Sequence, residues 1–130
     1  CAASLAVMEI IEDEKLIGRA NEVGSRLKST FEDWQEGNEF ACIGEVRGLG
    51  AMVAIEFVRD RETRQPWPEL VKAITHTAAE KGLLLLSCGV HGNVVRVLTP
   101  LTIPFDHLDE GIAILKDSLR AALEKVEAGQ

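Results

Sequence analysis

The sequence lacks the features that mark several large protein classes. It contains no run of Lys or Arg that could follow a phosphate backbone, and its net charge is −7, so no nucleic-acid partner is expected. The longest apolar stretches, residues 51–55 and 83–86, are far shorter than the roughly 18 residues of a membrane span, so we expect a soluble protein without membrane contact. Three widely spaced cysteines, Cys1, Cys42 and Cys88, make a poor disulfide framework and fit the reducing cytoplasm.

The chain is the size of one domain with one hydrophobic core. Its 130 residues are 46% hydrophobic, and a chain of this length buries roughly two thirds of its unfolded surface. The sequence begins with Cys1 instead of Met. An apolar pattern with helical spacing starts at once, with no capping residue or charged segment before it. We therefore expect residues 1–130 to be a single domain cut from a longer protein.

Three main helices are predicted from apolar residues that recur three and four positions apart. The first covers residues 16–34, after a shorter apolar stripe and an acidic turn at residues 12–14. Pro68 suits the first turn of the second helix, and Gly82 suits its end. Asp106 is expected to cap the third helix, which is long and has a continuous apolar face.

Two pairs of strands are predicted between these helices. Residues 43–46 and 51–58 are apolar and β-branched, and the glycine-containing connection between them suits a hairpin. Residues 83–87 and 94–98 form the second pair, joined by a glycine-rich loop at 88–93 whose backbone can approach a ligand closely. The predicted fold class is therefore α+β, a small, mainly antiparallel sheet with helices packed on one face.

Two motifs suggest chemistry but lack the residues that would complete it. Residues 48–50 resemble the start of a dinucleotide fingerprint, yet Val53 stands at the third glycine position and a strand follows where a helix is required. Cys88 and His91 have the spacing of half a zinc site, without a second pair, so no metal site is predicted. No His and acid pattern supports Cys88 as a nucleophile, and Glu56 is interpreted as the polar side of a half-exposed strand.

Arg96 is the residue that the pattern itself singles out. It is the only charged residue in the 94–98 strand, where alternation places it on the same face as Val94 and Leu98. A guanidinium among apolar neighbours must reach water or find an anion, because burying it unpaired is costly. Two interpretations stay open: an edge-strand arginine that reaches water, and a receptor for a carboxylate or phosphate beside the glycine loop.

Three segments carry a resemblance to a known family. They are residues 1–7 (CAASLAV), 45–52 (EVRGLGAM) and 92–101 (GNVVRVLTPL). They resemble the entering helix, the first hairpin and the substrate-facing strand of the C-terminal small domain of class III pyridoxal-phosphate-dependent aminotransferases, and within that family the 4-aminobutyrate aminotransferases. The resemblance covers essentially the whole chain. The last segment is the most specific, because it joins the loop, the lone arginine and the following proline in one order.

The resemblance implies an activity for a longer parent protein. That parent would move an amino group from 4-aminobutyrate or a related ω-amino acid to a keto acid through pyridoxal 5′-phosphate. The large domain, which would precede Cys1, holds the family's Schiff-base lysine and its other cofactor-binding groups. The parent is expected to be a homo-oligomer. No lysine of this chain matches the cofactor lysine motif.

The resemblance also implies which residues of this chain act. Arg96 matches the family's arginine that binds a substrate carboxylate, and Gly89 and Gly92 would lie near the substrate entrance. No catalytic and no cofactor-binding residue is expected in this chain, which by itself should be inactive and bind no cofactor. The alternative is a stand-alone module that binds a small carboxylate or serves dimerisation.

Overall fold

The computed structural model describes residues 1–129 as four helices and one four-stranded sheet. In chain order the elements are α1 (Ala2–Asp13), α2 (Leu16–Glu36), β1 (Ile43–Leu49), β2 (Met52–Phe57), α3 (Pro68–Glu80), β3 (Leu86–Cys88), β4 (Val94–Leu98) and α4 (Phe105–Ala128). The strands lie in the order β1-β2-β4-β3, and every neighbouring pair is antiparallel. The predicted α+β class is confirmed, with a sheet that is antiparallel throughout.

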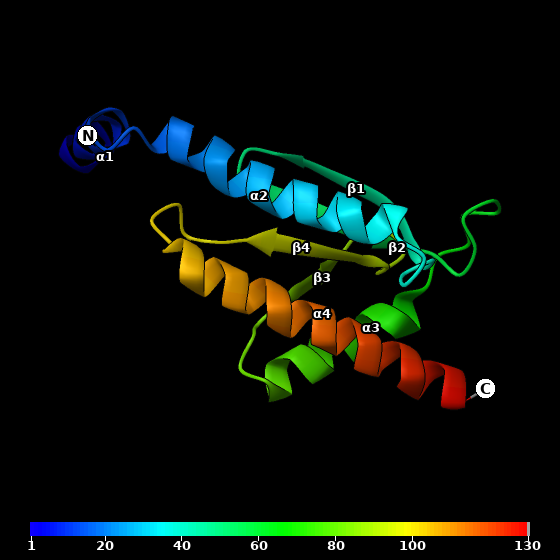
Figure 1. Cartoon of the computed structure of the whole chain (residues 1–130). Helices are drawn as coiled ribbons and strands as arrows, with labels where there is room; N and C mark the ends of the chain where they lie inside the picture. The colour runs from blue at the N-terminus through cyan, green and yellow to red at the C-terminus, as the bar shows by residue number, and fades with distance from the viewer. Residues whose placement is uncertain (130) are drawn as a thin grey trace.

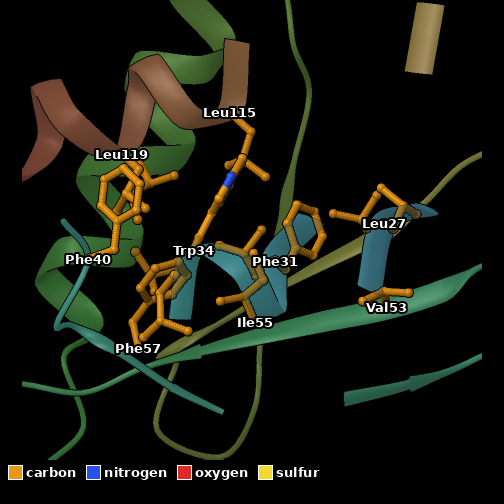
Figure 2. Packing of buried hydrophobic residues seen from close by; sticks show 14 of the residues in the cluster. Leu27, Phe31, Trp34, Phe40, Val53, Ile55, Phe57, Leu115 and Leu119 are labelled. Carbon is orange, nitrogen blue, oxygen red and sulfur yellow. The ribbon is translucent and has the colours of Figure 1, made fainter. Parts of the chain in front are cut away.

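The core lies between one face of the sheet and three helices. Strand β2 turns Val53, Ile55 and Phe57 toward this core, and each is at most 1% exposed. Figure 2 shows side chains of α2, including Phe31, between those of β2 and those of α4, including Leu115. Helix α1 contributes no buried residue and lies off the N-terminal end of α2 (Figure 1). The periodic apolar positions predicted for the helices therefore build one shared core.

The other face of the sheet, which we call the open face, carries the residues that alternate with the core residues. Four of its apolar members are exposed, Leu49 by 86%, Met52 by 46%, Leu86 by 59% and Leu98 by 62%, whereas Val94 is 3% exposed. The residues of the open face are Glu45, Arg47, Leu49, Met52, Ala54, Glu56, Leu86, Cys88, Val94, Arg96 and Leu98.

Helix α3 begins and ends as the sequence predicts, but the strand after it does not. Pro68 opens the helix, and Gly82 follows its end with φ +86°. The Leu83 N–H then donates to the Ala78 carbonyl oxygen at 2.9 Å, so it caps the helix instead of joining the sheet. The predicted strand at 83–87 is therefore wrong in its first half, and β3 begins only at Leu86.

Two other boundaries also differ from the prediction. Strand β1 extends to Leu49 and β2 begins at Met52, so the hairpin turn is confined to two residues, of which Gly50 has φ +53°. Helix α4 begins at Phe105, directly after a proline at the capping position. Asp106 therefore lies inside the first turn, where it accepts a hydrogen bond from the next backbone N–H, and the predicted cap is wrong.

Helix α2 packs against the β1–β2 turn at Gly24. A Cβ atom at position 24 would lie 1.9 Å from the Gly50 carbonyl oxygen, whereas a Cβ at Gly18 would have nothing within 4 Å. The absence of a side chain at position 24 therefore sets how closely the helix and the turn pack.

We predict opposite effects for alanine at these two positions. Gly24→Ala should lower the free energy of unfolding by about 1 to 3 kcal/mol, because the turn must move to admit the methyl group. Gly18→Ala should raise it by about 0.5 to 1 kcal/mol, because alanine is the better helix former. Denaturant unfolding of both variants measures the difference, and equal stabilisation would contradict the close approach at Gly24.

Candidate functional site

Arg96 lies in the middle of the open face, in a row of residues that crosses all four strands. In the register of the sheet Arg96 is opposite Ala54 on β2 and Leu86 on β3, and Ala54 is opposite Arg47 on β1. The backbones of the two arginines are therefore two strand spacings, or about 10 Å, apart. Only the small side chain of Ala54 stands between them, which leaves both guanidinium groups room above the sheet.

Arg96 is on an interior strand, and its guanidinium is incompletely paired. Because β4 lies between β2 and β3, the edge-strand interpretation of Arg96 is wrong. The side chain is half-buried, and its Nε is buried without a hydrogen-bond partner among residues 1–129. Every other arginine of the chain has a hydrogen-bond partner within the described residues. A carboxylate is the ligand that would satisfy such a group, since it accepts two parallel hydrogen bonds.

The glycine-rich loop reaches the open face next to Arg96. Gly89 and Gly92 have φ values of +86° and +64°, a region that favours glycine. A Cβ atom at Gly89 would lie 2.9 Å from Cγ2 of Val94, so the loop backbone rests directly on this valine. Val94 is two residues from Arg96 on the same face. The atom nearest to a Cβ at Gly92 is instead Cβ of Pro68, at 3.8 Å, at the start of α3. Of the two predicted loop glycines, the contacts bring Gly89 close to the arginine.

A buried asparagine that the sequence analysis missed holds this loop to the sheet. Asn93 is 4% exposed, and its Nδ2 donates to the Phe57 carbonyl oxygen at 3.0 Å. The Phe57 N–H donates in return to the Asn93 carbonyl oxygen at 2.8 Å. An asparagine before a strand is common, so nothing in the sequence marks Asn93 as special. Its pairing with Phe57, which is far away in the chain, is seen only in the folded structure.

A cluster of charged side chains, also missed from the sequence, occupies the β1 side of the same face. Arg47 Nη1 donates to Glu56 Oε2 at 2.7 Å and to Glu45 Oε2 at 3.4 Å. Arg64 Nη2, from the loop after β2, donates to the same Glu45 oxygen at 3.3 Å. Two acids and two arginines thus neutralise one another beside Arg96. Glu56 is half-buried, as its place in the strand suggested, but it has a definite partner.

Comparison with known proteins identifies the family of the chain. Residues 1–119 match the family model described as aminotransferase class-III. The chain belongs to the class III aminotransferases. This aminotransferase segment is 50% identical to the 5-aminovalerate aminotransferase of Pseudomonas aeruginosa over 90% of its length, and 47% identical to a probable 4-aminobutyrate aminotransferase of Bacillus subtilis over 93%. It spans 27% of the length of each of these relatives.

Solved aminotransferase structures contain the same fold. A Bacillus anthracis aminotransferase superposes with a TM-score of 0.82 and 30% identity, over 93% of this segment and 28% of that chain. The omega-transferase of Vibrio fluvialis superposes with a TM-score of 0.85 over 98% of the segment and 29% of that chain. At 24% identity, this second likeness shows the fold alone. The resemblance found in the sequence is therefore confirmed at the level of family and fold.

The lysines of the aminotransferase segment lie outside the strands of the sheet. None of them lies on a strand of the sheet, and each is in a helix or at a helix end: Lys15, Lys28, Lys72, Lys81, Lys116 and Lys125. None of the strand residues of the open face is therefore a lysine. Within residues 1–129 there is no cluster of three or more His, Cys, Asp or Glu able to hold a metal ion, and no helix suited to crossing a membrane.

The cysteines of the segment differ in burial and therefore in reactivity. Cys42 is 5% exposed, and burial raises the pKa of its thiol to about 11. Cys1 is exposed, and Cys88 is half-buried at the end of β3, on the open face. The thiolate is the reactive form of cysteine, so a raised pKa keeps Cys42 protonated and unreactive at neutral and mildly alkaline pH.

We predict that two of these thiols react in the folded chain and the third only after unfolding. With an aromatic disulfide reagent at about pH 8, Cys1 and Cys88 should be modified in the native state, and denaturant should expose one more equivalent. Cys42→Ser should leave the native count unchanged and remove the extra equivalent. Rapid native modification of all the cysteines would contradict the burial of Cys42.

Proposed function

We propose that this chain is the C-terminal small domain of a pyridoxal-phosphate-dependent aminotransferase and that its open face forms one wall of the substrate cleft. The whole protein would transfer an amino group from 4-aminobutyrate or a related ω-amino acid to a keto acid. The partners of this domain would be the remaining three quarters of the same chain and a second copy of the whole protein. Its cytoplasmic location stays a prediction.

The buried, unpaired Nε of Arg96 is the observation that carries this proposal. A charged donor left unsatisfied inside a protein is costly, whereas a hydrogen bond that involves a charge contributes roughly 1.5 to 3 kcal/mol. A substrate carboxylate would supply the missing acceptor and, through its second oxygen, a bidentate contact. Gly89 beside the site would admit the substrate without steric hindrance from a side chain.

The names of the relatives agree with this chemistry. Two relatives of this chain are named a 5-aminovalerate aminotransferase and a probable 4-aminobutyrate aminotransferase, and both compounds carry a carboxylate at the end opposite the amino group. An arginine that holds the carboxylate would fix the distance at which the amino group is presented. Positioning of this kind lowers a reaction barrier because the reacting groups no longer have to find one another.

The positions of the lysines suggest which part of the whole protein binds the cofactor and which part binds the substrate. When bound, pyridoxal phosphate supplies the electron sink for amino transfer. No strand residue of the open face is a lysine, and this supports the inference that the rest of the protein binds the cofactor. Residues 1–130 would then contribute substrate recognition only, and their part in the reaction is to bind and orient the carboxylate.

We predict that the 130-residue chain forms no specific complex with pyridoxal phosphate. Its lysines lie on helices, where any adduct would be nonspecific and reversible. Visible absorbance after incubation and dialysis is the measurement. Absorbance that survives dialysis and disappears when a single lysine is replaced would overturn the proposed division between the two domains.

We predict that Arg96→Ala in the full-length protein lowers kcat/KM for 4-aminobutyrate by an amount equivalent to about 2 to 5 kcal/mol of transition-state stabilisation. Arg96→Lys should restore only part of it, because lysine keeps the charge but not the planar fork. Butylamine, which lacks the carboxylate, is the control substrate and should be affected little by either change. Normal turnover of 4-aminobutyrate by the alanine variant would refute a carboxylate role for Arg96.

The reading frame that contains this segment separates the proposal from its alternative. Several hundred further residues upstream, including a lysine in the cofactor motif, would support the aminotransferase. A start codon beside Cys1 would instead favour a stand-alone module that binds a carboxylate or dimerises.

A further inference from the structure

Arg96 has an acidic neighbour, Glu56, whose carboxylate is chemically able to pair with the guanidinium in place of a substrate carboxylate. Among the sheet residues opposite or diagonal to Arg96, Glu56 is the only acid, since the others are Met52, Ala54, Leu86 and Cys88. Residues diagonal to each other on neighbouring strands are within reach when their side chains are long. Glu56 nevertheless makes no ion pair with Arg96 in the described residues, and its carboxylate is directed toward β1.

Arg47 is the residue that holds Glu56 on the β1 side. The register places Glu45 directly opposite Glu56, and like charges in this arrangement repel each other. That repulsion alone would drive Glu56 away from β1 and toward β4. Arg47 Nη1 offsets it by donating to both carboxylates, at 2.7 Å to Glu56 and 3.4 Å to Glu45, while Arg64 also neutralises Glu45.

We propose that Arg47 is a positioning residue that prevents Glu56 from pairing with Arg96 and so keeps the Arg96 guanidinium available to the substrate carboxylate. This inference rests on the proposed function of Arg96. Without Arg47, the Glu56 carboxylate is free to turn across Ala54 and occupy the guanidinium. A carboxylate tethered so near acts at a high effective concentration and competes with the substrate.

The charge balance of the face supports the same interpretation. Glu45 and Glu56 are matched by Arg47 and Arg64 through ion pairs whose N···O distances are all between 2.7 and 3.4 Å. The positive charge of Arg96 has no acidic partner among the described residues. Loss of Arg47 would change this balance, because one acid would then have no partner on its own side and would turn to the nearest cation.

The test uses the full-length aminotransferase and compares 4-aminobutyrate with butylamine. Arg47→Met keeps an unbranched apolar stem like that of arginine and removes the charged guanidinium, Arg47→Lys keeps the charge, and Glu56→Gln removes the charge of the competing acid. The matched control is Arg120→Met, because Arg120 is an exposed arginine of α4 that pairs with Glu39 and Asp117 on the helical side of the domain.

We expect Arg47→Met to raise KM for 4-aminobutyrate about tenfold with little change in kcat. Butylamine kinetics should not change, which also shows that the variant is folded. Adding Glu56→Gln to Arg47→Met should return KM to the parent value, a rescue that a purely structural role of Arg47 does not predict. Arg47→Lys should lie close to the parent, and Arg120→Met should match it.

Two results would overturn the inference and leave the function of Arg96 intact. One is an unchanged KM for 4-aminobutyrate in Arg47→Met. The other is a raised KM that Glu56→Gln does not reverse. Failure of the proposed function would look different, because Arg96→Ala would then turn over 4-aminobutyrate normally whatever residue stands at position 47.

Discussion

The pairing of β2 with β4 determines which side chains of the open face lie beside Arg96. These strands are separated in the chain by α3 and β3, yet Ala54 is opposite Arg96 and Val94 is opposite Glu56. Strand β1 pairs with the other edge of β2, and the register of that pairing places Arg47 opposite Ala54. Together the two pairings of β2 place two arginines and one glutamate in adjacent positions on one surface.

The one-sided packing of the helices gives that surface its chemical character. Helices α2, α3 and α4 share the core on the opposite face of the sheet. The strand residues buried in this core are therefore all apolar, whereas those on the open face can be polar or charged. The alternation of side chains along a strand lets Val95 and Val97 support the core while Arg96 between them is available to a ligand. Rigid packing below the sheet thus fixes the arginine above it.

Local sequence patterns predicted those features that depend on neighbours in the chain. The spacing of apolar residues located α2, Pro68 and Gly82 marked the ends of α3, and alternation put Arg96 on the same face as Leu98. The error at the start of β3 came from a backbone group that has a competing partner. Leu83 looked like the start of a strand because it is apolar, but its N–H is used by the end of α3.

Features that depend on distant segments were beyond these patterns. The edge-strand interpretation of Arg96 assumed that β4 had only one neighbouring strand. No pattern in the sequence near Arg96 indicates that β2 and β3 lie on the two sides of β4. The pair formed by Arg47 and Glu56 is likewise invisible in sequence. Each residue looks like the solvated side of its own strand until the register of β1 with β2 is known.

The position of Arg96 explains why an arginine can remain incompletely paired in a folded domain. Its half-buried side chain is carried by a strand whose neighbouring residues are held in the core, so the backbone cannot move to relieve the unsatisfied Nε. The nearest acid is held by Arg47, so rotation of Arg96 toward β1 would have to break an existing ion pair. An external carboxylate meets neither obstacle. The same contacts that leave the guanidinium unsatisfied in this domain thus favour a ligand from outside over an internal partner.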